Sequence, residues 1–311
     1  MRQFDDNQQS GTSMLTRRNF LQTAAAAAVL PHWLAHAQGA EVTALQLQHF
    51  PADEGGFSRA PVLLSGASEA ILIDGGFRLS DGRALAEAIV ATGKQLTTIY
   101  ISQSDPDYYF GLGPVMQAFP EAVVVAAPET VMAIAANVEK KLAVWGPQLR
   151  DNGPQRRENL VFAQPWGAPA LMHEGHRIDI VPAQGMDNRR YLWVPSLQAI
   201  VGGVLVFDGL HVWMADTPMA QERHAWRENL QAMLERQPKV VVPGHMAAGS
   251  KLDASALRFT LQYLQAYERA LVMARSSEEL IQSMLQRYPD LPGVSSLELG
   301  ARVVMGEMQW G

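Results

Sequence analysis

The stretch TTIYISQSDPDYYFG, residues 97–111, combines an apolar run with a polar turn. Residues 97–101 predict a buried strand, and residues 102–109 contain two serines, two aspartates and a glutamine. A loop that follows a strand is a common position for binding and catalytic side chains, because the sheet holds it in place. The turn contains neither histidine nor cysteine, so its residue types alone do not identify the chemistry that it supports.

Apolar runs and helical spacings on both sides of this stretch predict the rest of the fold. The further predicted strands are residues 45–48, 61–64, 70–73, 122–127, 177–181, 191–194, 199–201, 204–207 and 239–242. The predicted helices are residues 83–92, 128–142, 217–236 and 257–271, followed by one that begins at a capping box of Ser276 and Glu279. Residues 146–169, rich in Pro, Gly, Asn and Arg, predict a long surface insertion. This order predicts a four-layer α/β fold, an αββα sandwich of two mixed sheets flanked by helices.

Composition limits the classes of function that remain. The chain has 311 residues, of which 48% are hydrophobic and 18% charged, as expected for a folded globular protein. Its net charge is −6 and it has no long basic block, which argues against nucleic acid as a partner. It contains no cysteine, so disulfides, thiolate nucleophiles and thiolate metal ligands are excluded.

The N-terminal residues have the pattern of an export signal. Arg17 and Arg18 precede a weakly apolar stretch at residues 23–30, and Ala35 and Ala37 mark a small-x-small cleavage site. The paired arginines resemble a twin-arginine signal, which implies the twin-arginine export machinery as a partner and a periplasmic or otherwise exported protein. The alternative, a membrane anchor, is disfavoured because about 13 apolar residues fall short of the roughly 20 that span a bilayer. Translation from Met14 would keep the same signal.

These patterns predict three segments. Residues 1–37 are the expected signal peptide, residues 38–250 the α/β domain, and residues 251–311 a C-terminal helical extension packed on that domain.

Several landmarks along residues 42–250 resemble the metallo-β-lactamase fold superfamily. A strand ends in Asp74-Gly75-Gly76, matching the family's Asp-x-Gly, and Pro243-Gly244-His245 matches its last landmark. The loop pattern His-x-His-x-Asp-His-x-x-Gly aligns with residues 103–111. The resemblance implies a two-sheet sandwich and a hydrolase with a metal site at the ends of the strands.

The metal ligands depart from the family pattern. Gln103 and Asp105 stand where the first two histidines are expected, Tyr108 stands at the last histidine of the loop, and Gly203 stands at the bridging aspartate. The third histidine has no clear equivalent in residues 183–187. Asp107 and His245 remain as the family has them, so the resemblance implies a reduced site.

One hypothesis is a hydrolase with a single or weakly bound divalent metal acting on a small substrate. Asp105, Asp107 and His245 would be its ligands, an oxygen-rich set that favours Mn²⁺, Fe²⁺ or Mg²⁺, or weakens the binding of Zn²⁺. Tyr108 could add a phenolate, and His211 or Asp216 could replace a lost ligand.

The second hypothesis is a metal-free enzyme or a small-molecule-binding protein with no metal. Asp107 and His245 would then be an acid–base pair. The sequence favours the hydrolase, in which Gln103 and Tyr108 are expected to position water or substrate. The remaining polar residues expected to support this loop are Asp74, Ser102 and Ser104.

Purely structural explanations exist for the same residues. Residues 105–107 also fit an ordinary turn in which an aspartate caps the next helix, and residues 211–216 fit a strand with one satisfied histidine. The sequence has no Gly-x-Ser-x-Gly elbow, dinucleotide fingerprint or phosphate-binding glycine loop, which argues against serine esterases and nucleotide enzymes.

Overall fold

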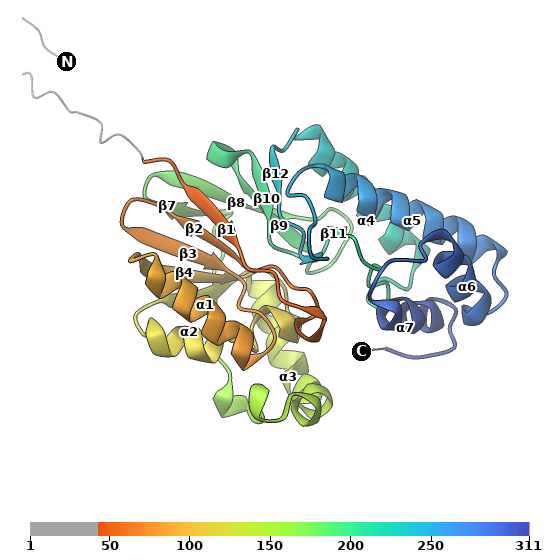
Figure 1. Cartoon of the computed structure of the whole chain (residues 1–311), viewed down its shortest axis with the longest axis horizontal. Helices are drawn as coiled ribbons and strands as arrows, with labels where there is room; N and C mark the ends of the chain where they lie inside the picture. The colour runs from red at the N-terminus through yellow and green to blue at the C-terminus, as the bar shows by residue number, and fades with distance from the viewer. Residues whose placement is uncertain (1–42, 311) are drawn as a thin grey trace, which may run out of the picture. The chain divides into compact units, whose positions relative to one another are not determined.

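Two mixed β-sheets pack face to face in the computed structural model, which describes residues 43–310 (Figure 1). The first sheet has its strands in sequence order, antiparallel from β1 to β3 and parallel from β3 to β6. These strands are β1 Gln46–His49, β2 Val62–Ser65, β3 Glu69–Ile73, β4 Gln95–Ile101, β5 Val123–Ala126 and β6 Gln164–Pro165.

The second sheet has the order β12-β10-β9-β8-β7, antiparallel except for the parallel pair of β10 and β12. Its strands are β7 Ala170–His173, β8 His176–Pro182, β9 Arg190–Val194, β10 Ala199–Val201 and β12 Val240–Val241. Beside it, β11 Phe207–Asp208 pairs in parallel with β13 His245–Met246. The strand expected at residues 204–207 is thus reduced to its last residue and the one after.

Successive side chains of a strand in the first sheet belong to two different hydrophobic clusters, one on each face of the sheet. In β2, Val62 and Leu64 enter the cluster between the sheets, whereas Leu63 joins the cluster under the helices. In β3, Ile71 and Ile73 face the inter-sheet cluster in the same way. Successive side chains of a strand point to opposite faces, so a strand that is apolar at every position is covered on both sides.

Helices supply the outer layers. Those beside the first sheet are α1 Leu79–Ala91, α2 Leu112–Ala118 and α3 Pro128–Leu149, and α4 Ala220–Glu235 lies beside the second (Figure 1). This confirms the four-layer αββα fold predicted from the sequence. The predicted bounds differ: α1 begins four residues earlier, α4 begins after Pro218 rather than at it, and α3 continues to Leu149, into the expected insertion.

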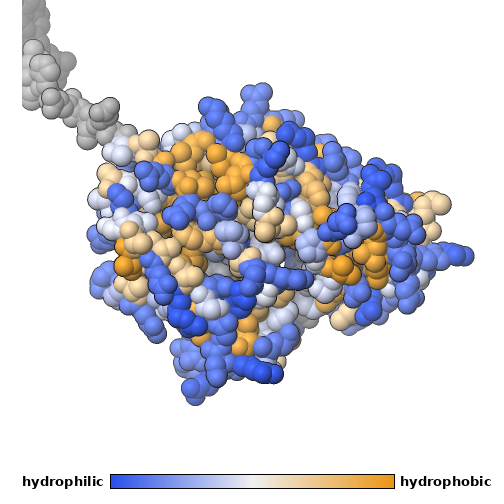
Figure 2. All heavy atoms as spheres, viewed as in Figure 1, coloured by the Kyte–Doolittle hydropathy of each residue, from blue (hydrophilic) through white to orange (hydrophobic). Residues whose placement is uncertain are grey.

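Three helices follow the second sheet: α5 Ser255–Met273, α6 Ser277–Arg287 and α7 Val294–Val304. Thr260 of α5 is fully buried, and its Oγ1 accepts a hydrogen bond from the Phe207 N–H at 3.0 Å. Hydrophilic side chains cover much of the face shown in Figure 2, with apolar side chains in separate patches. Within residues 43–310, every helix is too short or too polar to cross a bilayer.

Candidate functional site

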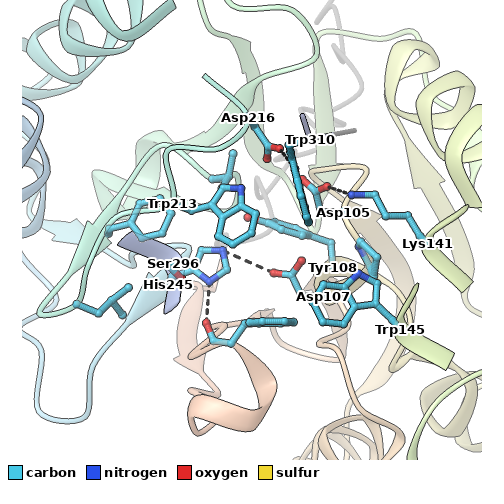
Figure 3. Close-up of a pocket in the computed structure, with 15 residues that line it drawn as sticks. Asp105, Asp107, Tyr108, Lys141, Trp145, Trp213, Asp216, His245, Ser296 and Trp310 are labelled. Carbon is cyan, nitrogen blue, oxygen red and sulfur yellow. Dashed lines mark hydrogen bonds and ion pairs between the residues drawn. The ribbon is translucent and has the colours of Figure 1, made fainter. Parts of the chain in front are cut away.

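The loop after β4 and the start of β13 meet at one end of the two sheets. Asp107 lies in a short 3₁₀ turn, Pro106–Tyr108, and His245 is the first residue of β13. The Oδ2 atom of Asp107 lies 3.6 Å from Nε2 of His245, although 138 positions separate them in the chain. The structure therefore brings together the two residues that keep the family pattern (Figure 3).

Arg59 lies beneath this pair, and the sequence analysis did not find it. Its side chain is fully buried, its Nη2 donates to Oδ2 of Asp74 at 2.7 Å, and its Nη1 donates to the Gly244 carbonyl. Its guanidinium carbon lies 3.8 Å from the centre of the Tyr108 ring. Its Nε lies 3.7 Å from Oδ2 of Asp107. The guanidinium is therefore a fixed positive charge next to the candidate catalytic carboxylate.

Asp74 braces the loop from below without lining the pocket described below. Its Oδ1 accepts the Ser102 N–H and its Oδ2 accepts the Ser102 hydroxyl, both at 2.7 Å. The Gly203 N–H in turn donates to Ser102 Oγ at 2.8 Å. Burial raises the pKa of Asp74, and the Arg59 guanidinium and the two hydrogen bonds from Ser102 oppose this rise. This network links the ends of β3, β4 and β10.

Burial moves the proton affinities of Asp107 and His245 in opposite directions. Burial raises the pKa of Asp107 to about 7; Arg59 opposes the rise and Asp105 adds to it. Burial, followed by the nearby charge of Arg59, lowers the pKa of His245 to about 3. At neutral pH the imidazole is neutral, and the carboxyl is poised between its two forms.

The tautomer of His245 follows from its contacts. Its Nδ1 lies 2.8 Å from the carbonyl oxygen of Phe57, which can only accept, so Nδ1 carries the proton. Its Nε2 therefore presents a lone pair toward Asp107. The separation of 3.6 Å is too long for a direct hydrogen bond, and Oδ2 of Asp107 has no hydrogen-bond partner among the described residues.

The other expected loop residues have different roles. Asp105 faces the pocket, but it is 3.4 Å from Lys141 and accepts a hydrogen bond from Gln103 at 3.0 Å. Gln103 is buried and does not line the pocket, so it holds Asp105 rather than water or substrate. Ser104 accepts from Asn188 at 3.1 Å on the outer side of the loop. No side-chain cap is formed by Asp105 on the following turn, in contrast to the simple capping explanation.

Tyr108 is a support rather than a metal ligand. Its hydroxyl donates to the Gly203 carbonyl at 3.2 Å, and its ring packs between Arg59 and His245. Burial raises its pKa well above the usual value, so the phenol keeps its proton and does not supply the phenolate considered above.

The two residues proposed as replacement ligands lie apart from each other. His211 is buried away from the pocket, with Nδ1 2.9 Å from the Tyr263 hydroxyl of α5, and burial lowers its pKa to about 4. Asp216 lines the pocket and accepts from Trp310 Nε1 at 2.9 Å. Residues 211–216 form no strand, because this segment follows an irregular path beside α5 and α7.

The described residues do not fit a divalent metal. A zinc site needs about three protein ligands, and residues 43–310 contain no group of three histidine or carboxylate side chains placed to hold an ion. Asp107 and His245 supply two donors, Asp105 is turned to Lys141, and Arg59 already lies against the carboxylate that would have to bind the ion.

The pocket above this pair is mostly apolar, with six Phe, Tyr and Trp residues among the fifteen that line it, and has a volume of about 90 Å³. Besides the residues already named, the sequence analysis missed Lys141, Trp145, Trp213 and Trp310, which lie on segments far apart in the chain (Figure 3). The full lining consists of Phe57, Asp105, Pro106, Asp107, Tyr108, Lys141, Trp145, Val204, Phe207, Leu210, Trp213, Asp216, His245, Ser296 and Trp310. A small apolar pocket with a few converging polar groups is the usual form of a ligand site.

Comparison with known proteins gives matches at the level of structure. The sequence matches no protein-family model and no curated protein. Among solved structures, a metallo-beta-lactamase from Pontibacter korlensis matches with a TM-score of 0.50 and 19% identity, covering 72% of this chain and 98% of that one. The DIM-1 metallo-beta-lactamase matches with a TM-score of 0.48 and 15% identity over 72% of this chain and 99% of that one. Similarity at this identity shows the fold alone: the matched 72% of the chain has the metallo-β-lactamase fold.

Proposed function

We propose that this chain is a hydrolase that acts on a small substrate by acid–base catalysis between Asp107 and His245, without a divalent metal. The observation that carries the proposal is the arrangement of Asp107 Oδ2, buried and without a hydrogen-bond partner, 3.6 Å from the lone pair of His245 Nε2 on the wall of a pocket. An acid–base group works best when its pKa lies near the working pH, and burial places Asp107 there.

A water molecule that donates one hydrogen to each of these atoms would be oriented for attack on a bound ester, amide or related bond. Ionised Asp107 takes the proton from this water as the water oxygen bonds to the substrate. The bond between the attacked atom and the leaving group then breaks as Asp107 returns the proton to the leaving group, so the carboxylate is regenerated. His245 stays neutral, because its pKa is low, and it serves to orient the water.

Arg59 supports a reaction of this kind without a metal. Its positive charge balances Asp74 and lies 3.7 Å from Asp107, in the part of the site where the resemblance implies a metal ion. Because Arg59 is fully buried, it does not contact substrate; it positions the carboxylate and limits the rise of its pKa.

A second candidate is a binding protein that uses the same pocket without turnover. The aromatic lining favours it, since Phe57, Trp145, Trp213 and Trp310 offer contact area that catalysis itself does not need.

The test is a hydrolysis screen of esters, amides and phosphoesters with a chelator present, together with metal analysis of the purified protein. We expect chelator-resistant turnover that falls by about 10²–10⁴ in Asp107→Asn. Asp151→Asn, on an exposed turn, is the matched control and should keep full activity. Stoichiometric metal that activity requires would refute the proposal, and ligand stabilisation without any turnover would favour the binding protein.

We also propose that the protein is exported by the twin-arginine route. Arg17, Arg18, Ala35 and Ala37 support this, and they lie outside the described residues. The pocket is lined by residues from Phe57 to Trp310, so it forms only after most of the chain has folded. A route that exports folded proteins suits such a site.

A further inference from the structure

The charges that line the pocket do not balance. Its lining carries the carboxylates of Asp105, Asp107 and Asp216 and one basic side chain, Lys141. Arg59, the nearby guanidinium, is turned to Asp74 beneath the lining. Arg189, just outside the lining, lies 3.4 Å from Oδ2 of Asp216. With all three carboxylates ionised, these carboxylates, Lys141 and Arg189 still sum to one negative charge, so the pocket opposes anions and favours a positively charged ligand.

One of these carboxylates is aimed into the pocket without a donor. Asp107 is 8% exposed, and its Oδ2 has no hydrogen-bond partner among the described residues. Burial also raises the pKa of Asp216, with a further rise from the neighbouring charge of Asp105, whereas Arg189 and the hydrogen bond from Trp310 oppose the rise. Asp107 thus lies in a poorly solvated space, and the guanidinium beside it, Arg59, also pairs with Asp74.

The aromatic side chains suit the same kind of ligand. Trp213 and Trp310 meet edge to face, with ring centres 5.3 Å apart, and Phe57 and Trp145 meet in the same way at 5.2 Å. All four line the pocket, and Figure 3 shows three indole rings around Asp107 and His245. Tryptophan is the strongest aromatic partner for an organic cation.

The protein itself already places an ammonium group in this environment. Lys141 Nζ lies 3.4 Å from Asp105 and 5.6 Å from the ring centre of Trp310. Lys141 thus places its ammonium group near both a carboxylate and an indole ring. A ligand ammonium beside Asp216 and Trp310 would make the same two kinds of contact.

We propose that the pocket recognises a small organic cation, with its ammonium group against Trp213, Trp310 and Asp216 and its apolar part toward Phe207 and Leu210. Binding of the cation stands on the pocket alone. Its identification as the substrate class rests on the proposed function, since the bond to be cleaved would then lie over Asp107 and His245.

The test compares three probes of nearly equal shape by calorimetry at pH 8: tetramethylammonium, tert-butanol and pivalate. We expect tetramethylammonium to bind at least about tenfold more tightly than tert-butanol, and pivalate to bind most weakly. Equal affinities, tighter binding of pivalate, or no binding of tetramethylammonium would overturn the proposal.

Two variants locate the cation. Asp216→Asn keeps an acceptor for Trp310 but removes the charge and leaves Arg189 without its carboxylate, and it should weaken tetramethylammonium binding about tenfold. Trp310→Leu should weaken it about fivefold. The matched controls are Asp151→Asn and Trp166→Leu, outside the pocket, which should leave affinity unchanged. If folded Asp216→Asn and Trp310→Leu both bind like the parent protein, the cation is not held where we place it and the proposal fails.

The outcomes separate the two proposals. Binding of tetramethylammonium with no hydrolysis in any screen supports the cation site and counts against the acid–base mechanism. Turnover that depends on Asp107 but acts on anionic substrates supports the mechanism and overturns the cation site.

Discussion

Arg59 organises the polar groups at this end of the sheets. A guanidinium with no exposed surface is stable only when its donors are matched, and Asp74 and the Gly244 carbonyl match two of its nitrogens. Its plane also covers the Tyr108 ring. Nothing in the sequence marks it, because Arg59 stands alone before the apolar run of β2 and belongs to no motif. Only its partners, brought in from distant segments, reveal its role.

The Arg59–Asp74 ion pair should be strongly coupled. Arg59→Met leaves a buried carboxylate without its cation, so we expect a loss of about 3–5 kcal/mol in the free energy of unfolding, and a similar loss for Asp74→Asn. The double variant should cost less than the two losses added together by at least about 1.5 kcal/mol. Urea unfolding of the four proteins measures this coupling. The exposed pair of Arg157 and Glu139, 3.5 Å apart, is the control and should couple by less than about 1 kcal/mol. A coupling energy below about 1 kcal/mol between Arg59 and Asp74 would contradict the proposed organising role of Arg59.

The pKa values of Asp107 and His245 predict opposite effects of pH on stability. The folded-state pKa of Asp107, about 7, is above its ordinary value of 3.8. Between these two pH values the folded protein binds more protons than the unfolded chain, so the free energy of unfolding falls as the pH rises from 3.8 to about 7. Asp107→Asn removes this loss and should be more stable than the parent protein at pH 8, by up to about 4 kcal/mol, but not at pH 4.

His245 acts in the other direction. Its folded-state pKa, about 3, is below the ordinary 6.5, so stability is lost as pH falls from 6.5 toward 3. His245→Gln should therefore lose less stability than the parent protein between pH 7 and pH 4. Thermal unfolding across pH 4–8 measures both variants. Parallel curves for the parent protein and both variants would show that neither group titrates with the shifted pKa.

At the scale of elements, glycines allow the ends of the strands to approach closely enough to form the site. Gly203 has a φ of +75°, and a Cβ there would lie 2.0 Å from the Arg190 carbonyl oxygen. A Cβ on Gly244 would lie 2.2 Å from the Gly203 carbonyl oxygen. The backbone therefore leaves no room for the aspartate that the resemblance implies at Gly203, which is a physical reason why a bridging metal ligand is absent from this position.

Gly203→Ala should be far more destabilising than a matched glycine substitution. The added Cβ meets backbone that cannot move alone, so we expect a loss of more than about 3 kcal/mol in the free energy of unfolding. Gly249 has a φ of +83° with open space around its Cβ position, and Gly249→Ala should cost only about 1–2 kcal/mol of backbone strain. Denaturant unfolding compares the two, and similar losses would show that the close approach at Gly203 is not rigid.

Local sequence patterns predicted which helices form more accurately than they predicted the residues at which those helices begin and end. Ser276 caps α6, with the Glu279 N–H donating to its hydroxyl at 3.3 Å, as the capping-box pattern indicated. The Glu279 carboxylate accepts a hydrogen bond from the Arg275 N–H rather than from the Ser276 N–H. The second hydrogen bond of the expected capping box is therefore made to a different residue. The helix α1 begins before its expected start because Arg78 and Asp81 form the cap, a pairing that the apolar spacing does not include.

At the scale of the whole molecule, the pocket is completed by both halves of the chain. Ser296 of α7 and Trp310 after it form part of the wall that faces the β4 loop. The Tyr263 hydroxyl of α5 lies 2.9 Å from His211, and the Thr260 hydroxyl bonds to β11. The helix α7 and the residues after it therefore contribute to the pocket, and α5 supports the segments beside it, although the sequence resemblance ended near residue 250.

The export proposal also concerns the chain as a whole. The substitution Arg17-Arg18→Lys-Lys should leave the uncleaved precursor in the cytoplasm, because the export route reads the paired arginines. Fractionation followed by mass measurement checks this result, and the parent chain should appear outside the cytoplasm without residues 1–37. Normal export of the lysine variant would refute the twin-arginine signal.

Sequence alone determined the layered fold, because the period of apolar residues fixes which face of each strand is buried, and that information is local. It also indicated Asp107 and His245, through the resemblance in which both keep the residue types of the family pattern. Tertiary structure alone decided the character of the site. Side chains that are distant in sequence produce the buried charge of Arg59, the shifted pKa values and the tryptophan lining of the pocket. Desolvation and charge pairing depend on distances between these side chains, and a local sequence pattern does not contain those distances.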